Sequence, residues 1–345
     1  MAEPVADLPE QTFVQSALKR VAKSNDVAIA NKESRVLQPE RYVNHAYVHD
    51  ARSRFLWSLP QPILVLGSML AIATAITTEW VDADLFTTFM ILLPLPLFLL
   101  AERYVPKRTD WILEPKELAE DAFWLAGAAF IWVPLYSDYY ETPISWAFEW
   151  LRDVSTVPFT LNPETTLGLI LAALFVRATS EFIYYWLHRI QHETLFWWRI
   201  HATHHHITKM SAARGDRTHP LEWLALSLGT PIVLALFGAT DDVIAVTGAF
   251  GFFNGICNHS NLPLVTNKLY GLFFSTASMH HVHHAHDMEY SNKNYGCSII
   301  IWDRIFGTYL DVDMVDACGA GKGEALDLKT QYALAFYSDE ELKQL

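Results

Sequence analysis

The chain has 345 residues, of which 51% are hydrophobic and 13% aromatic, and its formal net charge is −13 at pH 7. This acidic balance argues against nucleic acid as a partner. The three cysteines, Cys257, Cys297 and Cys318, are widely spaced, so they indicate neither a disulfide framework nor a Cys-x-x-Cys metal site. Because the first residues are polar and acidic, we expect no cleavable signal peptide.

Residues 1 to about 55 are polar and of mixed charge. Phe13, Leu18 and Val21 can line one side of a short amphipathic helix. His45 and His49 are four residues apart, but no second histidine cluster lies near them in the sequence. We therefore expect this pair to bind no metal.

Apolar runs then follow one another along the chain. The first, residues 60–78, contains no charge and is long enough to cross about 30 Å of hydrocarbon. Pro94 and Pro96 should kink the second run. We expect an acidic loop at residues 137–164. The predicted spans are residues 60–78, 85–101, 120–136, 165–187, 221–238 and 243–258, of which the last two are joined by a turn at 238–242.

Charges between these runs predict the orientation. Residues 103–116 are basic, as is the N-terminal segment, whereas residues 79–84 and 137–164 are acidic. The positive-inside rule therefore places the basic segments in the cytoplasm. The last two spans form a hairpin that leaves after His219 and returns at His259, so both residues should lie at the same cytoplasmic face as His188.

Twelve of the fifteen histidines lie between His188 and His284, in repeated helical spacings. A His-x-x-x-His pair is followed by two His-x-x-His-His trios, and residues three or four apart share one face of a helix. Imidazole binds iron, zinc, copper and nickel. The clustered histidines are His188 and His192, then His201, His204 and His205, then His280, His283 and His284.

About ten convergent histidines exceed the needs of one ion, so two metal ions match the count better. Two-metal sites serve hydrolysis or redox chemistry. A zinc protease is disfavoured because no His-Glu-x-x-His motif is present. A metal-dependent membrane hydrolase, a metal transporter and a haem-binding electron carrier remain as alternatives.

Several neighbouring residues can support the histidines. Glu181, inside the fourth span, can orient a ligand histidine or pair with Arg177, and Asp216 or Glu222 can act near the metals. We expect a helix at residues 299–307 beside the cluster. The acidic last 35 or so residues should be peripheral.

The motifs in this order resemble those of the fatty acid hydroxylase and sterol desaturase superfamily. The resemblance covers residues 165–310. Besides the histidine motifs it includes Arg-x-His-Pro-x-Glu at 217–222, His-Ser-Asn at 259–261, Lys-Asn-Tyr-Gly at 293–296 and Trp-Asp-Arg-Ile-Phe-Gly-Thr-Tyr at 302–309.

The resemblance implies a membrane di-iron oxygenase that uses two iron ions, O₂ and two electrons to hydroxylate or desaturate a C–H bond of a lipid, such as a fatty acyl chain, a sterol or a lipid head group. Because the sequence shows no fused haem or flavin module, we expect a separate cytoplasmic electron donor of the ferredoxin or cytochrome b5 type. In some branches of the superfamily the His259 position belongs to a His-x-x-x-His pair, and here Gly255 replaces its first member. The metal ligands carried over are His188, His192, His201, His204, His205, His219, His259, His280, His283 and His284, whereas His206, His281 and His286 fall off the ligand faces.

We therefore expect an all-α fold, a polytopic membrane helical bundle of four to six spans with a cytoplasmic histidine-rich metal-binding cap. We divide the chain into a cytoplasmic N-terminal segment (1–58), N-terminal spans and loops (59–164), the hydroxylase-like di-iron domain (165–310) and a cytoplasmic C-terminal tail (311–345).

Overall fold

The structure is a computed structural model that describes residues 50–155, 160–312 and 315–345. The amphipathic helix expected near Leu18 and the His45–His49 pair lie outside these residues. Within them every regular element is a helix, and strand-like pairing is limited to two isolated bridges, Phe274 with Ile299 and Ala285 with Cys318. The predicted all-α fold is confirmed, and the four-part division of the chain stays a prediction.

Among the described residues, five helical segments are long and apolar enough to cross a membrane. This number lies within the predicted range of four to six. The segments are α3 (Ala51–Trp57) with α4 (Pro60–Thr78); α5 (Ala83–Leu92) with α6 (Pro94–Tyr104); α7 (Pro115–Gly127), η4 (Ala128–Trp132), α8 (Val133–Tyr136), η5 (Ser137–Glu141) and α9 (Thr142–Ser155); α10 (Thr166–Glu193); and η7 (Pro220–Glu222), α12 (Trp223–Leu226) and α13 (Gly229–Phe237).

Two of the predicted elements differ from the structure. Residues 137–155 were expected in an acidic loop but form η5 and α9, because Ala147, Trp150, Leu151 and Val154 recur at helical spacing and the charges fall between them. The sixth predicted span is a helix, α14 (Asp241–His259), but it is not among the five membrane-length apolar segments. It is packed between other helices, so it does not need an apolar surface facing lipid.

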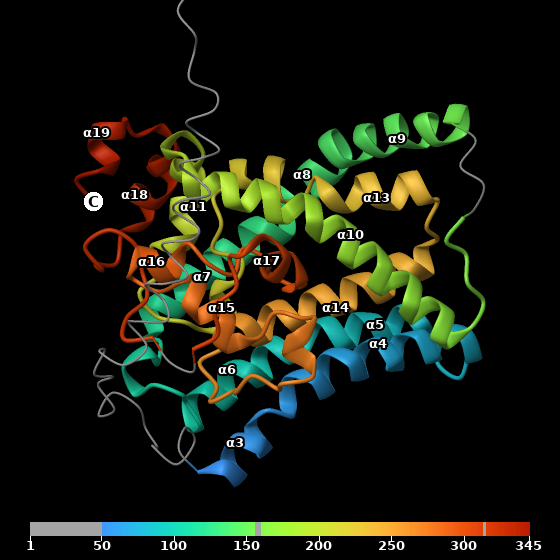
Figure 1. The fold of residues 1–345 in the computed structure, drawn as a ribbon, viewed down its shortest axis with the longest axis horizontal. Coiled ribbons are helices and arrows are strands. Elements are labelled where there is room, and N and C mark those ends of the chain that lie inside the picture. The colour runs from blue at the N-terminus through green and yellow to red at the C-terminus, as the bar shows by residue number, and fades with distance from the viewer. Residues whose placement is uncertain (1–49, 156–159, 313–314) are drawn as a thin grey trace, which may run out of the picture. The chain divides into compact units, whose positions relative to one another are not determined.

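The centre of the bundle is α14, which packs against both α4 and α10 (Figure 1). Val65 and Met69 of α4, Val176 of α10 and Phe250 of α14 are fully buried in one apolar core. Polar contacts fix the register of the helices: the Gln61 side-chain amide donates to Asn254 and Asn258, each at 2.9 Å. Buried amide pairs of this kind admit few alternative alignments.

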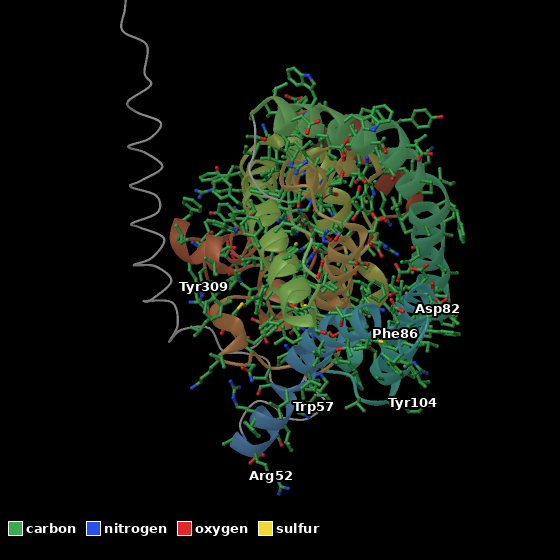
Figure 2. All side chains as sticks on the ribbon, turned by 90° about the vertical axis from the view of Figure 1, so that its right-hand side faces the viewer. Arg52, Trp57, Asp82, Phe86, Tyr104 and Tyr309 are labelled. Atoms are coloured by element: carbon green, nitrogen blue, oxygen red, sulfur yellow. The ribbon has the colours of Figure 1, made fainter. Side chains whose placement is uncertain are left out.

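The other spans enclose this centre. α13 packs on α10, and α9 packs on α13. α10 and α13 approach closely at Gly229, where an added Cβ atom would lie 2.6 Å from the Ser180 carbonyl oxygen. α5 and α6 lie at an outer edge, where Figure 2 shows Asp82 at the start of α5 and Tyr104 at the end of α6.

Short helices and loops form a cap at one end of the bundle. The cap comprises η3 (Thr109–Trp111), α11 (Leu195–His205), η6 (Ala212–Arg214), η8 (Tyr270–Leu272), α15 (Ala277–His283), α16 (Met288–Ser291), α17 (Ile301–Phe306), α18 (Leu328–Ala333), η9 (Leu334–Phe336) and α19 (Asp339–Leu342). The predicted helix near residues 299–307 is confirmed as α17, which packs on α10 through Phe306 against Tyr185 and Trp186.

The C-terminal residues are part of this cap, which corrects the expectation that they are peripheral. The amide of Ala320 donates to the carbonyl of His205 at 2.7 Å, and that of Gly319 to the carbonyl of His284 at 3.2 Å. The Thr203 hydroxyl donates to the carbonyl of Gln331 at 2.8 Å. In Figure 1, α18 and α19 lie beside α11 accordingly. The acidic composition of this segment did not indicate the packing, because many of the contacts are made by backbone groups and do not depend on the side chains.

Candidate metal centre

Nine buried histidines gather in two groups at the junction of the bundle and the cap. In each group the possible ligand atoms all lie within 4.8 Å of one another. The groups adjoin, because the rings of His205 and His284 stack with centroids 4.5 Å apart. The five-histidine group comprises His188, His192, His201, His205 and His283, and the four-histidine group comprises His204, His259, His280 and His284.

Helix geometry explains how each trio supplies both groups. His201 and His205 are one turn apart on α11 and enter the five-histidine group together. His204 precedes His205 by one residue, so it projects about 100° away and enters the four-histidine group. On α15, His283 likewise enters the five-histidine group, whereas His280 and His284 enter the four-histidine group. Sequence spacing suggested one shared face for each trio, whereas the structure separates its members.

His219 is the one predicted ligand that lies outside both groups. Its Nδ1 accepts from the amide of Leu221, and its Nε2 lies 3.2 Å from the carbonyl oxygen of Tyr332. His219 therefore caps a helical turn and contacts the C-terminal segment. His206, His281 and His286 also lie outside the groups, as expected.

Backbone carbonyl groups orient three of the clustered histidines. Nδ1 of His188 lies 2.6 Å from the Tyr295 carbonyl oxygen, and Nδ1 of His283 lies 2.8 Å from that of Lys293. Nδ1 of His259 lies 3.0 Å from the carbonyl oxygen of Gly255. A carbonyl oxygen only accepts, so each of these nitrogens must carry its proton. In the neutral rings, each Nε2 is then unprotonated and carries a free lone pair.

These lone pairs point at one another. Nε2 of His188 lies 3.0 Å from Nε2 of His283 and 2.9 Å from Nε2 of His201. Two unprotonated nitrogens at this distance repel, and a hydrogen bond between His188 and His283 is impossible with both protons on Nδ1. A cation between them removes the repulsion. The donor set therefore fits a metal ion, and neutral imidazole is a common ligand of iron, zinc and copper.

The surroundings keep the histidines of the cap uncharged. Burial is the largest cause that lowers their pKa values well below the ordinary value of 6.5, and neighbouring histidines lower them further. Unprotonated rings bind metal without first losing a proton. The affected residues are His201, His204, His205, His280, His283 and His284.

The carboxylate of Glu222 orients the ring of His201. Its Oε1 accepts a hydrogen bond from Nδ1 of His201, and both side chains are 1% exposed. Carboxylates in this position fix the orientation and raise the basicity of a metal-binding imidazole. Glu222 is one of the acids that the sequence suggested for such a role. Glu181, another of them, instead lies 3.5 Å from Arg177 and accepts from the amide of Ser298.

Two further carboxylates hold the backbone around the histidines, and neither was expected from the sequence. Asp303 accepts from the amides of Tyr295 and Gly296, each at 2.8 Å. It thus fixes the loop whose carbonyl groups orient His188 and His283. Burial raises the pKa of Asp303 to about 6. The position of this aspartate in a mostly apolar stretch was the sequence signal for its role.

Glu102 performs the corresponding role beside His259. It accepts from the amides of Ala212 and Asn261, each at 2.8 Å, and from the Ser211 hydroxyl. Asn261 in turn bonds the backbone of Arg108 through both ends of its amide. This network holds the chain just after His259 against the end of α6. Glu102 lies at the end of a predicted span, where a buried carboxylate is costly unless it is satisfied.

A cavity of about 550 Å³ adjoins the candidate metal centre. It lies between α10, α13 and α14 and is reached by Tyr184, Asp216 and Glu222. Tyr184 precedes His188 by one turn, and their rings are 5.2 Å apart. The volume falls in the usual range for small-molecule sites.

Residues 172–308 match the sequence model of the family described as fatty acid hydroxylase. These residues include all nine clustered histidines, Glu222 and Asp303. The match covers about two fifths of the chain, so this part of the chain is similar to the fatty acid hydroxylase family.

Three curated relatives are similar in sequence to part of this chain. The chain is 36% identical to ornithine lipid hydroxylase OlsE of Rhizobium tropici over 147 residues, which are 42% of this chain and 41% of that protein. It is 35% identical to alkylglycerol monooxygenase of Homo sapiens over 135 residues, 37% of this chain and 28% of the relative. It is 29% identical to very-long-chain aldehyde decarbonylase CER1 of Arabidopsis thaliana over 152 residues, 41% and 24% of the two chains.

The aligned part thus spans at most about two fifths of these three relatives. No solved structure matches the chain significantly.

Proposed function

We propose that this protein is a membrane di-iron oxygenase that hydroxylates a C–H bond of a lipid. The observation that carries the proposal is the convergence of nine buried imidazoles in two adjoining groups, with unprotonated nitrogens facing one another. Such an arrangement is stable with cations present and repulsive without them. Two adjoining groups match two ions better than one.

Under this proposal the five-histidine group and the four-histidine group hold the metal pair. Bound iron would supply the redox chemistry by which O₂ is activated toward a C–H bond. In the balanced reaction, one oxygen atom enters the C–H bond as a hydroxyl group and the other leaves as water, with two electrons and two protons consumed. His219 is not part of the proposed ligand set.

Other residues of the chain hold the proposed ligand histidines in position. Glu222, Tyr295 and Lys293 hold the imidazole rings of His201, His188 and His283 in the orientations that leave Nε2 free. Asp303 keeps the loop with the two carbonyl groups in place. The cavity next to Tyr184 gives the substrate a place near the metals.

The relatives indicate the substrate class. Two of them are named for action on ornithine lipid and on alkylglycerol. Five helical segments of the described residues are long and apolar enough to cross a membrane, which supports a lipid substrate for the present chain. We propose that the substrate enters from the bilayer and that the termini and histidines face the cytoplasm, where a separate ferredoxin or cytochrome b5 type donor supplies electrons.

Metal analysis and Mössbauer spectroscopy on iron-enriched protein test the proposal first. We expect about two irons per chain, with spectra that change on reduction and on exposure to O₂. One zinc per chain and no iron signal would support a hydrolase or a transporter instead. A haem signal would support the electron carrier.

A pair of histidine variants tests the site itself. His284→Ala removes one nitrogen of the four-histidine group, so we expect loss of iron and of lipid hydroxylation while the protein still inserts into the membrane. The matched control is His45→Ala, from the isolated His-x-x-x-His pair, which should retain both iron and activity. Full activity in His284→Ala would overturn the assignment.

A further inference from the structure

A row of aromatic side chains runs from the candidate metal centre to the protein surface. The ring of Tyr295 lies 5.3 Å from that of His192 and 5.9 Å from that of His188, centroid to centroid. The rings of Tyr295 and Tyr185 are 5.9 Å apart, and those of Tyr185 and Trp186 are 5.3 Å apart. We call Tyr295, Tyr185 and Trp186 the aromatic row.

The aromatic row is buried at one end and open at the other. Tyr295 is 2% exposed and Tyr185 is 0% exposed, whereas Trp186 is 37% exposed. The guanidinium group of Arg189 lies over the Trp186 ring and pairs with the exposed Glu193 at 2.8 Å. Charged groups gather where a membrane helix meets water, so dissolved molecules can reach the outer end of the row.

Packing alone does not require tyrosine and tryptophan at these positions. Phe306 stacks on Tyr185 with centroids 5.3 Å apart and fills the same apolar region without a polar atom. Tyrosine and tryptophan lose an electron readily, whereas phenylalanine does not. The row therefore consists, at every position, of side chains that can be oxidised and reduced again.

The hydroxyl group of Tyr185 has a route for its proton. It accepts from Nη1 of Arg189 at 3.1 Å and lies 3.0 Å from Oγ1 of Thr308. The Thr308 hydroxyl donates to Oδ1 of the buried Asp303 at 2.6 Å. Because Thr308 has one hydroxyl proton, its oxygen must accept from Tyr185. A tyrosine that can pass on its proton as it loses an electron is oxidised more easily than one that cannot.

The electron count of the proposed reaction is short by two when no lipid is bound. Reduction of O₂ to two water molecules takes four electrons and four protons. A pair of ferrous ions would supply two of the electrons, and the lipid C–H bond supplies the other two during hydroxylation. Without lipid the missing electrons are withdrawn from the protein, and the histidines beside the metals are the nearest groups.

We infer that the aromatic row supplies these two electrons from the surface and so protects the histidines when no lipid is bound. This inference rests on the proposed function. Each electron moves from Trp186 to Tyr185, then to Tyr295 and the five-histidine group. The proton that Tyr185 gives up moves through Thr308 toward Asp303 and returns when Tyr185 is reduced again.

The outer end of the row then closes the balance. Trp186 recovers each electron from a dissolved one-electron reductant, such as ferrocyanide. Where no reductant is present, Trp186 loses two electrons and two protons and gains one oxygen atom from water. The first case regenerates the protein, and the second leaves a stable mark on it.

A single turnover without lipid tests the inference. Iron-loaded, fully reduced protein in a fluorinated detergent, whose chains offer no C–H bond, is mixed with O₂. Peptide mapping should then locate one added oxygen atom on Trp186. Ferrocyanide in the same mixture should keep Trp186 intact and be oxidised itself, two molecules for each O₂ consumed.

Trp186→Phe removes the outer end of the row, so oxidation of ferrocyanide should be lost and added oxygen should appear on the histidines of the five-histidine group. Trp197→Phe is the matched control, because Trp197 is 39% exposed and its ring lies against Phe196 at 5.1 Å. That control should oxidise ferrocyanide as wild type does.

Tyr185→Phe tests the middle of the row together with the proton route. Phenylalanine keeps the buried ring but raises the barrier to electron loss, so the rate of ferrocyanide oxidation should fall about tenfold or more. Tyr270→Phe is the control, because it also removes a buried hydroxyl, one that donates to Asn254 at 2.8 Å. It should keep the wild-type rate.

The outcomes separate this inference from the proposed function. Added oxygen on Trp198, which also contacts His192 at 5.3 Å, with Trp186 intact would overturn the inference alone. An unchanged rate in Tyr185→Phe would do the same, as would protein that consumes O₂ only after membrane lipids are added. Iron-loaded protein that consumes no O₂ with or without lipid would overturn both.

Discussion

At the scale of single residues, protonation decides what the histidines can do. His188 and His283 are held by backbone carbonyl groups that require a proton on Nδ1, so their facing Nε2 atoms have only lone pairs. Glu222 favours a proton on Nδ1 of His201 in the same way. The chemistry of the centre therefore depends on residues that are not ligands themselves.

Glu222→Gln tests this dependence. The amide can still contact Nδ1 of His201, but it loses the charge that raises the basicity of the ring, so metal affinity should fall about tenfold to a hundredfold. Competition with a chelator measures it. Asp339→Asn, which alters an exposed ion pair with Arg199, is the matched control and should change nothing. Unchanged affinity in Glu222→Gln would refute the positioning role.

At the scale of elements, the loop after α16 connects α17 to the metal centre. Asp303 on α17 holds the amides of Tyr295 and Gly296 and accepts from the Thr308 hydroxyl at 2.6 Å. The same loop presents its carbonyl groups to two histidines from different helices. One buried carboxylate thus keeps α10 and α15 in a fixed relation.

Asp303→Ala should therefore damage both stability and metal retention. It leaves two buried amides without an acceptor, and the expected loss is about 3 kcal/mol or more of unfolding free energy. Thermal melting in detergent and the rate of iron release report the two effects. Asp327→Ala, which removes an exposed cap from α18, should have little effect on either. Equal behaviour of the two variants would contradict the role given to Asp303.

At the scale of the whole molecule, the bundle, the cap and the C-terminal segment bury the histidines together. The backbone bonds from Ala320 to His205 and from Gly319 to His284 add a C-terminal layer over α11 and α15. This burial makes stability depend on pH, because the unfolded chain exposes the same rings to water.

Metal-free protein should lose stability as the pH falls below 6.5. Burial lowers the pKa of His206 to about 4, so the folded state takes up its proton at a lower pH than the unfolded chain does. At pH 5 this residue alone removes about 2 kcal/mol of the stability present above pH 6.5, and the buried histidines of the cap act in the same direction.

Melting temperatures of metal-free protein at pH 8 and pH 5 check this expectation. His206→Gln should reduce the difference between the two temperatures. Asp303 works in the opposite sense, because its raised pKa favours the folded state as the pH falls through about 6. A melting temperature that is the same at both pH values would contradict the expected loss of stability in acid.

The sequence by itself determined the helical class, five of the six predicted membrane segments and the nine histidines that form the two groups. Apolar length and helical spacing are local properties, and they are visible without any knowledge of packing. The same local view misassigned residues 137–155 to a loop, because the charges of α9 were counted and their spacing was not.

Only the tertiary structure decided how the histidines are divided and what holds them. The division of His204 from His205, the exclusion of His219 and the roles of Asp303 and Glu102 depend on contacts between residues distant in the chain. Spacing along a helix gives the direction of a side chain relative to its own axis, but what the side chain meets is set by the neighbouring helices.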